Sequence, residues 1–189
     1  MRVMRAHGVV IGLSFLLVSC GGGSSAAVSC DQEYWDGVVG TCLPEGWEIV
    51  DAETLRQRGV PEETIVAFQA SESLSGQFPT VAITRERLTN VVEPSRYSEA
   101  NMRSIEVIDG YTHVDTRDFT IADTDVQLHI FTAQPIEGEP RRRFYQVSTV
   151  HEEDGFTVTG VSPVSIGQAL EDAMLLIIES TIFEEPVKE

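Results

Sequence analysis

The chain has 189 residues, enough for one domain with a sizeable hydrophobic core. Its 13 Lys and Arg residues face 30 Asp and Glu residues, which gives a net charge of −17. A charge of this sign and size excludes nucleic acid and an anionic membrane surface as partners held by electrostatic attraction.

The N-terminus has the pattern of an export signal. Arg2 and Arg5 form a short basic region, and the apolar run Val9–Val18 is shorter than the roughly 20 residues that a membrane-spanning helix needs. The segment Leu17-Val18-Ser19-Cys20 then resembles the lipobox of bacterial lipoproteins. We therefore expect residues 1–19 to be a signal peptide and Cys20 to carry lipid after cleavage. The alternative is an ordinary signal peptide with a chance cysteine.

Residues 20–29 predict a lipidated cysteine followed by a flexible tether. Gly21–Ala27 reads GGGSSAA, a composition that cannot form a packed core. Several acyl chains on one terminus are enough for stable anchoring. The protein is therefore predicted to be anchored to a membrane, on its periplasmic or extracellular face. Gly21 after the cysteine resembles outer-membrane sorting if the organism is diderm. Cleavage would remove two arginines and no acid, which moves the charge from −17 to −19.

Cys30 and Cys42 are the two cysteines that remain after Cys20. A pair of cysteines in an exported domain indicates a disulfide rather than two free thiols. Asp36-Gly37 between them is a typical hairpin turn. Residues 30–42 are therefore predicted to form a disulfide-closed hairpin, stabilised by roughly 3 kcal/mol through loop closure.

Residues 43–107 predict a mixture of strands and helices. Asp51 can cap a helix that runs through Arg58 and stops at Gly59. A second helix is expected from Pro94 to about Val107. The apolar, β-branched or alternating segments of this region predict strands at Trp47–Val50, Thr64–Ala70 and Thr80–Thr84.

From Tyr111 onward the pattern is mainly β. His129 alternates with apolar residues and is expected to be half-exposed on its strand. Ser165 and Gln168 match a capping box and predict the start of a last amphipathic helix that reaches Ile178. The predicted strands are Tyr111–Ile121, Val126–Ala133, Arg143–Val150 and Phe156–Val161, with a solvated acidic turn at Glu152, Glu153 and Asp154.

The order of these elements resembles the PsbP-like family, which includes small bacterial lipoproteins of the LpqN and DcrB type. The resemblance implies an α+β fold, an α/β/α sandwich with a central antiparallel sheet, over residues 43–184, followed by an acidic tail at 185–189. It implies an accessory or binding protein and carries over no site residues. The segments that carry it are Pro44–Trp47, Thr80–Ile83, Tyr145–Val147, Phe156–Thr159 and Ser180–Phe183.

The chain lacks most residue patterns of common enzymes. Its only lysine is Lys188, near the end, and neither a Gly-x-Ser-x-Gly elbow nor a His-Glu-x-x-His helix occurs. We expect no catalysis, no cofactor and no bound metal. Carboxylates remain as the one set of groups that would support general acid–base chemistry.

The histidines give no clear site. His113, His129 and His151 lie on separate predicted strands or loops, whereas a zinc site needs three or four converging ligands. His151 begins the acidic turn and is expected to face solvent. A Ser148, His129 and Asp115 triad is conceivable but is better explained by chance, because serine and aspartate are abundant.

Two charged clusters remain. Asp31, Glu33 and Asp36 fail the spacing of a calcium loop and leave only weak divalent binding as an alternative. Arg141, Arg142 and Arg143 are the one basic cluster. They are predicted to be a solvated start of a strand, or else a contact for an anionic group or a partner.

The leading hypothesis is a lipid-anchored extracytoplasmic accessory or binding module without catalysis, whose partner is an unknown envelope protein or small ligand. The alternative is a lipoprotein that binds a small ligand or lipid in a pocket between sheet and helix. The third possibility is a small carboxylate-dependent enzyme.

Overall fold

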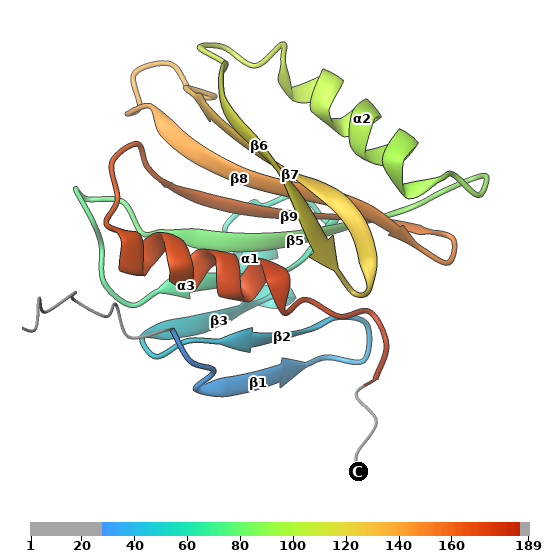
Figure 1. Ribbon diagram of the computed structural model, residues 1–189. Coiled ribbons are helices and arrows are strands. Elements are labelled where there is room, and N and C mark those ends of the chain that lie inside the picture. Colours follow the sequence, from blue (N-terminus) through green and yellow to red (C-terminus); the bar gives the residue numbers. More distant parts are fainter. Residues whose placement is uncertain (1–27, 186–189) are drawn as a thin grey trace, which may run out of the picture.

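The computed structural model describes residues 28–185. Seven antiparallel strands form one sheet in the order β3-β4-β5-β9-β8-β7-β6, and β1 pairs with β2 in a separate hairpin (Figure 1). This confirms the α+β fold with a central antiparallel sheet. The elements are β1 Gln32–Trp35, β2 Gly40–Leu43, β3 Trp47–Asp51, α1 Ala52–Gln57, β4 Thr64–Ala70, β5 Thr80–Arg87, α2 Pro94–Ile105, β6 Thr112–Ile121, β7 Thr124–Ala133, β8 Arg142–His151, β9 Asp154–Pro163 and α3 Gln168–Glu179.

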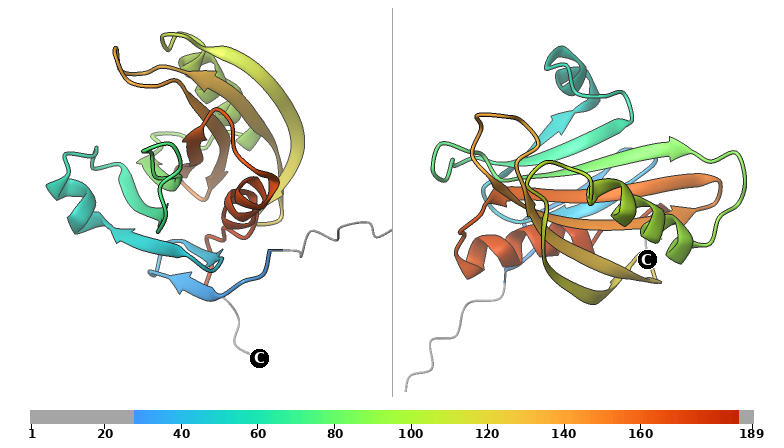
Figure 2. Two further views of the ribbon diagram at one scale, coloured as in Figure 1. Left: turned by 90° about the vertical axis from the view of Figure 1, so that its left-hand side faces the viewer. Right: turned by 90° about the horizontal axis from the view of Figure 1, so that it is seen from above.

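The sheet is strongly curved, and the helices lie on both of its sides. Figure 2 shows α3 inside the curve, whereas α1 and α2 lie outside it. We call these sides the concave and the convex face. Consecutive strands pair throughout except at the centre, where β5 pairs with β9 and thereby joins the two halves of the sheet.

The main hydrophobic core lies on the concave face, between the sheet, α3 and the β1–β2 hairpin. The hairpin is part of this core, since Val39 and Leu43 are completely buried and Tyr34 makes an edge-on contact with Phe68. Other buried members are Val66, Val81, Ile83, Leu128, Ile130, Tyr145, Val147, Phe156, Val158, Met174, Ile177 and Ile178.

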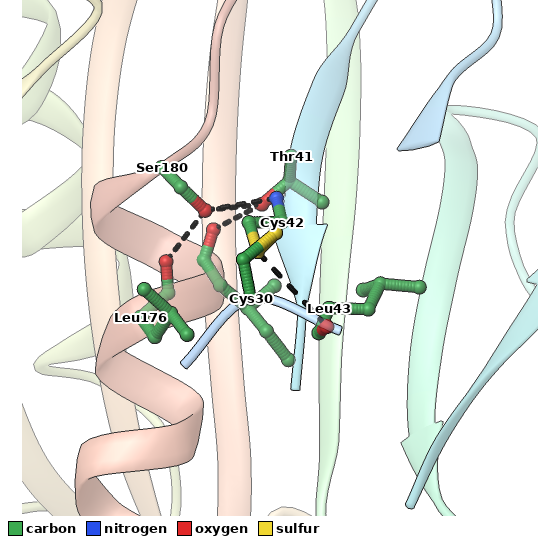
Figure 3. The surroundings of a disulfide bond; sticks show 7 residues. Cys30, Thr41, Cys42, Leu43, Leu176 and Ser180 are labelled. Atoms are coloured by element: carbon green, nitrogen blue, oxygen red, sulfur yellow. Dashed lines mark hydrogen bonds between the residues drawn. A yellow bond between two sulfur atoms is a disulfide. The ribbon is translucent and has the colours of Figure 1, made fainter. Parts of the chain in front are cut away.

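Hydrogen bonds join the hairpin to the last turn of α3. Gly40 and Ile182 exchange two backbone bonds of 2.9 Å each. The Thr41 hydroxyl lies 2.6 Å from the Ile177 carbonyl, and the Ser180 hydroxyl donates to Leu176 while it accepts from the Cys42 amide (Figure 3). The hairpin therefore satisfies carbonyls that a helix end leaves without partners.

The convex face has two small apolar clusters instead of one core. The cluster under α1 contains Val50, Leu55 and Ala67, and the cluster near α2 contains Ile105, Phe131 and Ala133. Buried polar side chains occupy the strands between these clusters, among them Gln146, Ser148 and Thr157.

The helix ends test the capping predictions. Asp51 caps α1 as expected, because its carboxylate accepts the Thr54 amide at 2.8 Å. The Ser165–Gln168 capping box is wrong. The N-cap of α3 is Gly167, which has no side chain to accept a hydrogen bond, and the helix begins only at Gln168.

Candidate functional site

The predicted disulfide is present. Cys30 and Cys42 are bonded, with their Cα atoms 5.5 Å apart. Asp36 and Gly37 form the turn, in which the Asp36 carboxylate accepts the Val38 and Val39 amides at 2.8 Å. Asp36 therefore has a local structural role. Cys20 and the predicted signal peptide lie outside the described residues.

Arg141, Arg142 and Arg143 have three different surroundings. Arg142 and Phe144 are two residues apart on β8 and point to the same, convex side, where Phe144 stacks on Phe131. Arg142 pairs there with Glu139 at 2.6 Å. Arg143 lies on the opposite, concave side and is half-buried. Exposed Arg141 precedes β8 and donates from Nε to the Thr132 hydroxyl at 3.0 Å. The basic cluster is thus divided between the two faces.

Arg141 and Arg143 meet at Thr132. Arg143 is the direct cross-strand neighbour of Thr132, so the two side chains lie on the same face of the sheet. Tyr145, two residues after Arg143, points to the same face, where it lies near Met174 of α3. This places two guanidinium groups and a tyrosine along one end of the concave face.

Two donors of this cluster have no hydrogen-bond partner among the described residues. One is Nε of Arg143 and the other is the hydroxyl of Tyr145, whose side chain is completely buried. Buried polar atoms of this kind are rare in native proteins, because each costs about 1–3 kcal/mol when left unpaired.

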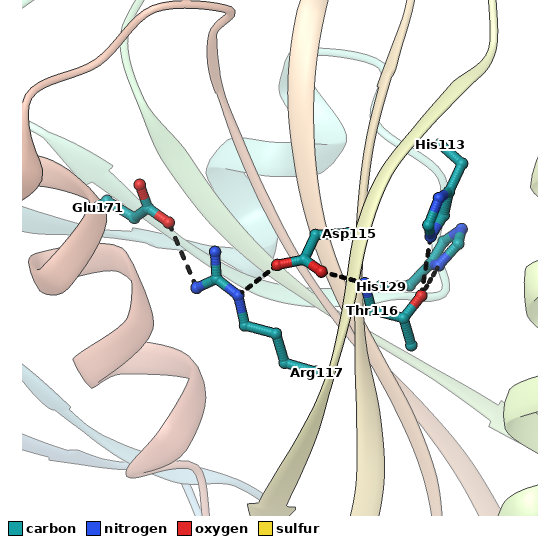
Figure 4. A network of polar contacts seen from close by, with 6 residues as sticks. All are labelled: His113, Asp115, Thr116, Arg117, His129 and Glu171. Atoms are coloured by element: carbon teal, nitrogen blue, oxygen red, sulfur yellow. Dashed lines mark hydrogen bonds and ion pairs between the residues drawn. The ribbon is translucent and has the colours of Figure 1, made fainter.

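Arg117 extends the cluster across β6. Its Nε donates to Asp115 at 2.8 Å, and its Nη1 lies 3.6 Å from the carboxylate of Glu171 in the first turn of α3 (Figure 4). The bond from Arg117 lowers the pKa of Asp115. Burial raises the pKa of Tyr145, as does Glu171, whereas nearby Arg143 and Arg117 act in the opposite direction.

A second polar network lies on the convex face. The Tyr111 hydroxyl is 2.9 Å from Nε2 of His129. The Thr116 hydroxyl is 2.9 Å from His113 and 3.4 Å from Nδ1 of His129. His129 is only 2% exposed, so the predicted half-exposed position is wrong. Burial and then His113 lower the pKa of His129, and Glu106 raises it.

The residues of the conceivable triad do not converge. Ser148 lies 3.0 Å from the hydroxyl of Thr157, whereas Asp115 points to the concave face toward Arg117. A bulge in β6 explains the separation, because the register shifts between His113 and Asp115 and sends them to opposite faces.

The acidic turn is less solvated than the sequence indicates. Asp154 is buried and pairs with Arg85 at 2.5 Å, so its predicted solvated position is wrong. His151 is half-buried and stacks on Phe183 with a ring separation of 5.7 Å, which corrects its predicted contact with solvent.

An open hollow of about 540 Å³ lies where the β6–β7 hairpin meets the end of α3. Its lining includes three carboxylates and is more polar than that of a typical small-molecule pocket. The lining residues are Asp118, Phe119, Thr120, Asp125, Val126 and Glu179.

Within residues 28–185, no group of three or more His, Cys, Asp or Glu side chains is arranged to hold a metal ion. None of the helices described is long and apolar enough to cross a membrane.

Comparisons with known proteins identify the fold. No family model and no curated protein sequence matches the chain. LpqN of Mycobacterium tuberculosis, a protein involved in cell envelope biogenesis, superimposes with a TM-score of 0.60 at 14% identity, over 80% of this chain and 90% of LpqN. CyanoP, the cyanobacterial PsbP of Synechocystis, gives 0.54 at 14% identity, over 89% of this chain and 99% of CyanoP.

A third structure, the protein of unknown function PA94 from Pseudomonas aeruginosa, has a TM-score of 0.54 at 13% identity, over 82% of this chain and 98% of PA94. These likenesses confirm the PsbP-like fold. At such low identities they establish the fold alone, because one fold hosts many functions.

Proposed function

We propose that this chain is a lipid-anchored extracytoplasmic protein that serves as a binding or accessory module and has no catalytic activity of its own. The observation that carries the proposal is the Cys30–Cys42 disulfide, which closes a hairpin whose Val39 and Leu43 are completely buried in the main core. A disulfide so integrated into the fold fits an oxidising compartment.

Two independent features support the envelope location. The Leu17–Cys20 segment provides the lipobox pattern and is followed by a Gly- and Ser-rich stretch. LpqN, which shares the fold, is a protein of cell envelope biogenesis. Lipid on Cys20 would therefore hold a folded binding domain at the membrane by a short connection.

The positions of the reactive side chains favour binding over catalysis. A general base must lie within hydrogen-bond reach of the nucleophile that it activates. Ser148 is instead bonded to Thr157, and Asp115 lies across the sheet from His129. On the concave face, by contrast, Nε of Arg143 and the Tyr145 hydroxyl are buried without a hydrogen-bond partner within residues 28–185, and this unused capacity favours a ligand-binding role.

The anchoring part of the proposal is tested with Cys20→Ser. In the native host, the wild-type chain should incorporate labelled fatty acid and sediment with membranes. The variant should incorporate none and accumulate as an uncleaved precursor. Gly21→Ala is the matched control, since it leaves the cysteine intact and should be labelled like wild type. Labelled Cys20→Ser protein would contradict the proposed anchor.

The absence of catalysis is tested by assays of the purified chain against esters, glycosides, phosphates and peptidoglycan fragments. We expect no turnover above a buffer control. Turnover that one carboxylate or histidine substitution abolishes, with the thermal transition unchanged, would contradict the binding-module proposal.

A further inference from the structure

We propose that Arg141, Arg143 and Tyr145 form a binding site for a phosphate group on the concave face, where β8 begins. The site deepens the proposed function, because it names the chemical class that the binding module recognises. It does not depend on the lipid anchor, so failure of either proposal is visible separately.

The arrangement of the backbone brings the donors together. Arg143 and Thr132 are cross-strand neighbours on β8 and β7, and Arg141 donates to the Thr132 hydroxyl at 3.0 Å. On the other side of Arg143 the cross-strand neighbour is Ser162 of β9. Arg143 therefore lies in the middle of a polar row, directly beside Tyr145 on the same face.

The free hydrogen-bonding capacity of this row defines the ligand. Arg143 Nε and the Tyr145 hydroxyl are buried, unpaired donors within the described part of the chain. Arg143 lies close enough to Tyr145 to oppose the rise in pKa that burial causes at its hydroxyl, and an oxyanion offers several acceptor oxygens to a guanidinium and a hydroxyl together. Burial raises the pKa of Tyr145, which keeps its hydroxyl protonated and able to donate.

Charge is also left uncompensated here. Arg142 pairs with Glu139, and Arg117 pairs with Asp115 and Glu171. The ion pairs found within residues 28–185 include no carboxylate partner for Arg141 or Arg143. Arg141 is held instead by neutral acceptors, which are the Thr132 and Thr112 hydroxyls and the Gly110 carbonyl, so its charge stays uncompensated. Guanidinium groups without carboxylate partners suit an oxyanion such as phosphate.

The overall charge indicates how a phosphate reaches this site. A net charge of −17 repels an anionic surface at long range, so recognition must depend on short contacts. Arg141 is exposed and Arg143 is half-buried, so solvent reaches the cluster at these two side chains, whereas Tyr145 is completely buried. The phosphate comes either from a small soluble ligand or from a lipid headgroup, and the two sources share this chemistry.

The test is calorimetric titration of the full chain in neutral detergent with inorganic phosphate. Arg143→Gln should weaken binding about tenfold or more, because it removes charge-assisted bonds. Tyr145→Phe should weaken it several-fold. The matched control is Arg142→Gln, which removes the neighbouring charge from the convex face and should change the affinity less than about twofold, as expected when no charge-assisted bond to the ligand is lost.

Three outcomes would overturn the site: no phosphate binding by wild type, an equal loss in Arg142→Gln, or unchanged binding in both Arg143→Gln and Tyr145→Phe. If Arg143→Gln does not fold, Arg143→Lys keeps the charge without Nε and should still bind more weakly than wild type. Detergent micelles with and without phosphatidylglycerol separate the sources, because the anchor inserts into both. A lower apparent affinity for inorganic phosphate in micelles that contain this lipid supports a headgroup as the competing ligand, whereas equal affinity in both supports a soluble phosphate.

Discussion

The two faces of the sheet are stabilised in different ways. The concave face is closed by α3 and the hairpin, which share a continuous apolar core and the hydrogen bonds of Thr41 and Ser180. The hairpin is itself closed by the Cys30–Cys42 disulfide. The convex face is covered by α1 and α2 over separate small clusters, with buried polar residues such as His129 between them.

This difference indicates where stability and sensitivity reside. Apolar burial contributes about 25 cal/mol per Å² without any need for exact partners, so the concave face should dominate the free energy of unfolding. A buried histidine network is stable only while its protonation state is maintained. The convex face should therefore respond to pH and open more easily.

The largest expected effect is in the concave core. Ile177→Ala removes a completely buried side chain of α3 and should lower the free energy of unfolding by about 4 kcal/mol, within the range for such cavities. Leu55→Ala on the convex face should cost about 2 kcal/mol, because its cluster is small and can collapse. Chemical denaturation of both variants measures the difference, and equal losses would contradict the comparison.

The disulfide should have the next largest effect. Replacing Cys30 and Cys42 together by serine should lower the free energy of unfolding by about 3 kcal/mol, because the closed loop restricts the unfolded chain. The unfolding midpoint in denaturant checks this value. An unchanged midpoint would show that the hairpin does not depend on its covalent closure.

Matched serines on the two helices sharpen the comparison further. Ser180→Ala leaves the Cys42 amide without its acceptor and should cost about 1–2 kcal/mol. Ser104 of α2 makes a similar local bond, to the Asn101 carbonyl, but is exposed. Ser104→Ala should cost less than about 0.5 kcal/mol. Similar melting shifts in the two variants would contradict the hairpin–helix junction as a stabilising contact.

The last predicted effect depends on pH. The folded-state pKa of His129 lies below its ordinary value of 6.5, so the unfolded chain binds the proton first as pH falls. Stability is therefore complete above pH 6.5 and decreases below it, by at most about 1.4 kcal/mol per pH unit for one proton. His113, Tyr111 and Glu106 are the titratable groups that face or influence it.

His129→Gln should remove this part of the pH dependence. The measurement is the free energy of unfolding between pH 7.5 and pH 5, for wild type and variant. Parallel curves for wild type and variant would show that folding does not disfavour the protonation of His129.

The strands were predictable because their patterns are local. Val126, Leu128 and Ile130 alternate along β7, and the paired cysteines predict the disulfide from their number and setting. The burial of His129 was not predictable. It depends on α2 and Tyr111, which cover the convex face of β7, and the period of the strand does not reveal this cover.

The roles of the hairpin and of the arginines also depend on distant contacts. Thr41 bonds to Ile177, which is 136 positions away in the sequence, so no local sequence pattern predicts this contact. The three consecutive arginines were recognisable as a cluster. Their division between faces follows from where β8 begins and from its pairing with β7, and both are set by the sheet.

Native-state hydrogen exchange tests the central difference between the two faces most directly. The amides of Ile177 and Ile178 in α3, and those of β2, should exchange only through global unfolding, whereas the amides of α2 should exchange through a local opening of lower free energy. The predicted result is two distinct groups of protection factors, one for each face. Equal protection of α2 and α3 would contradict the account.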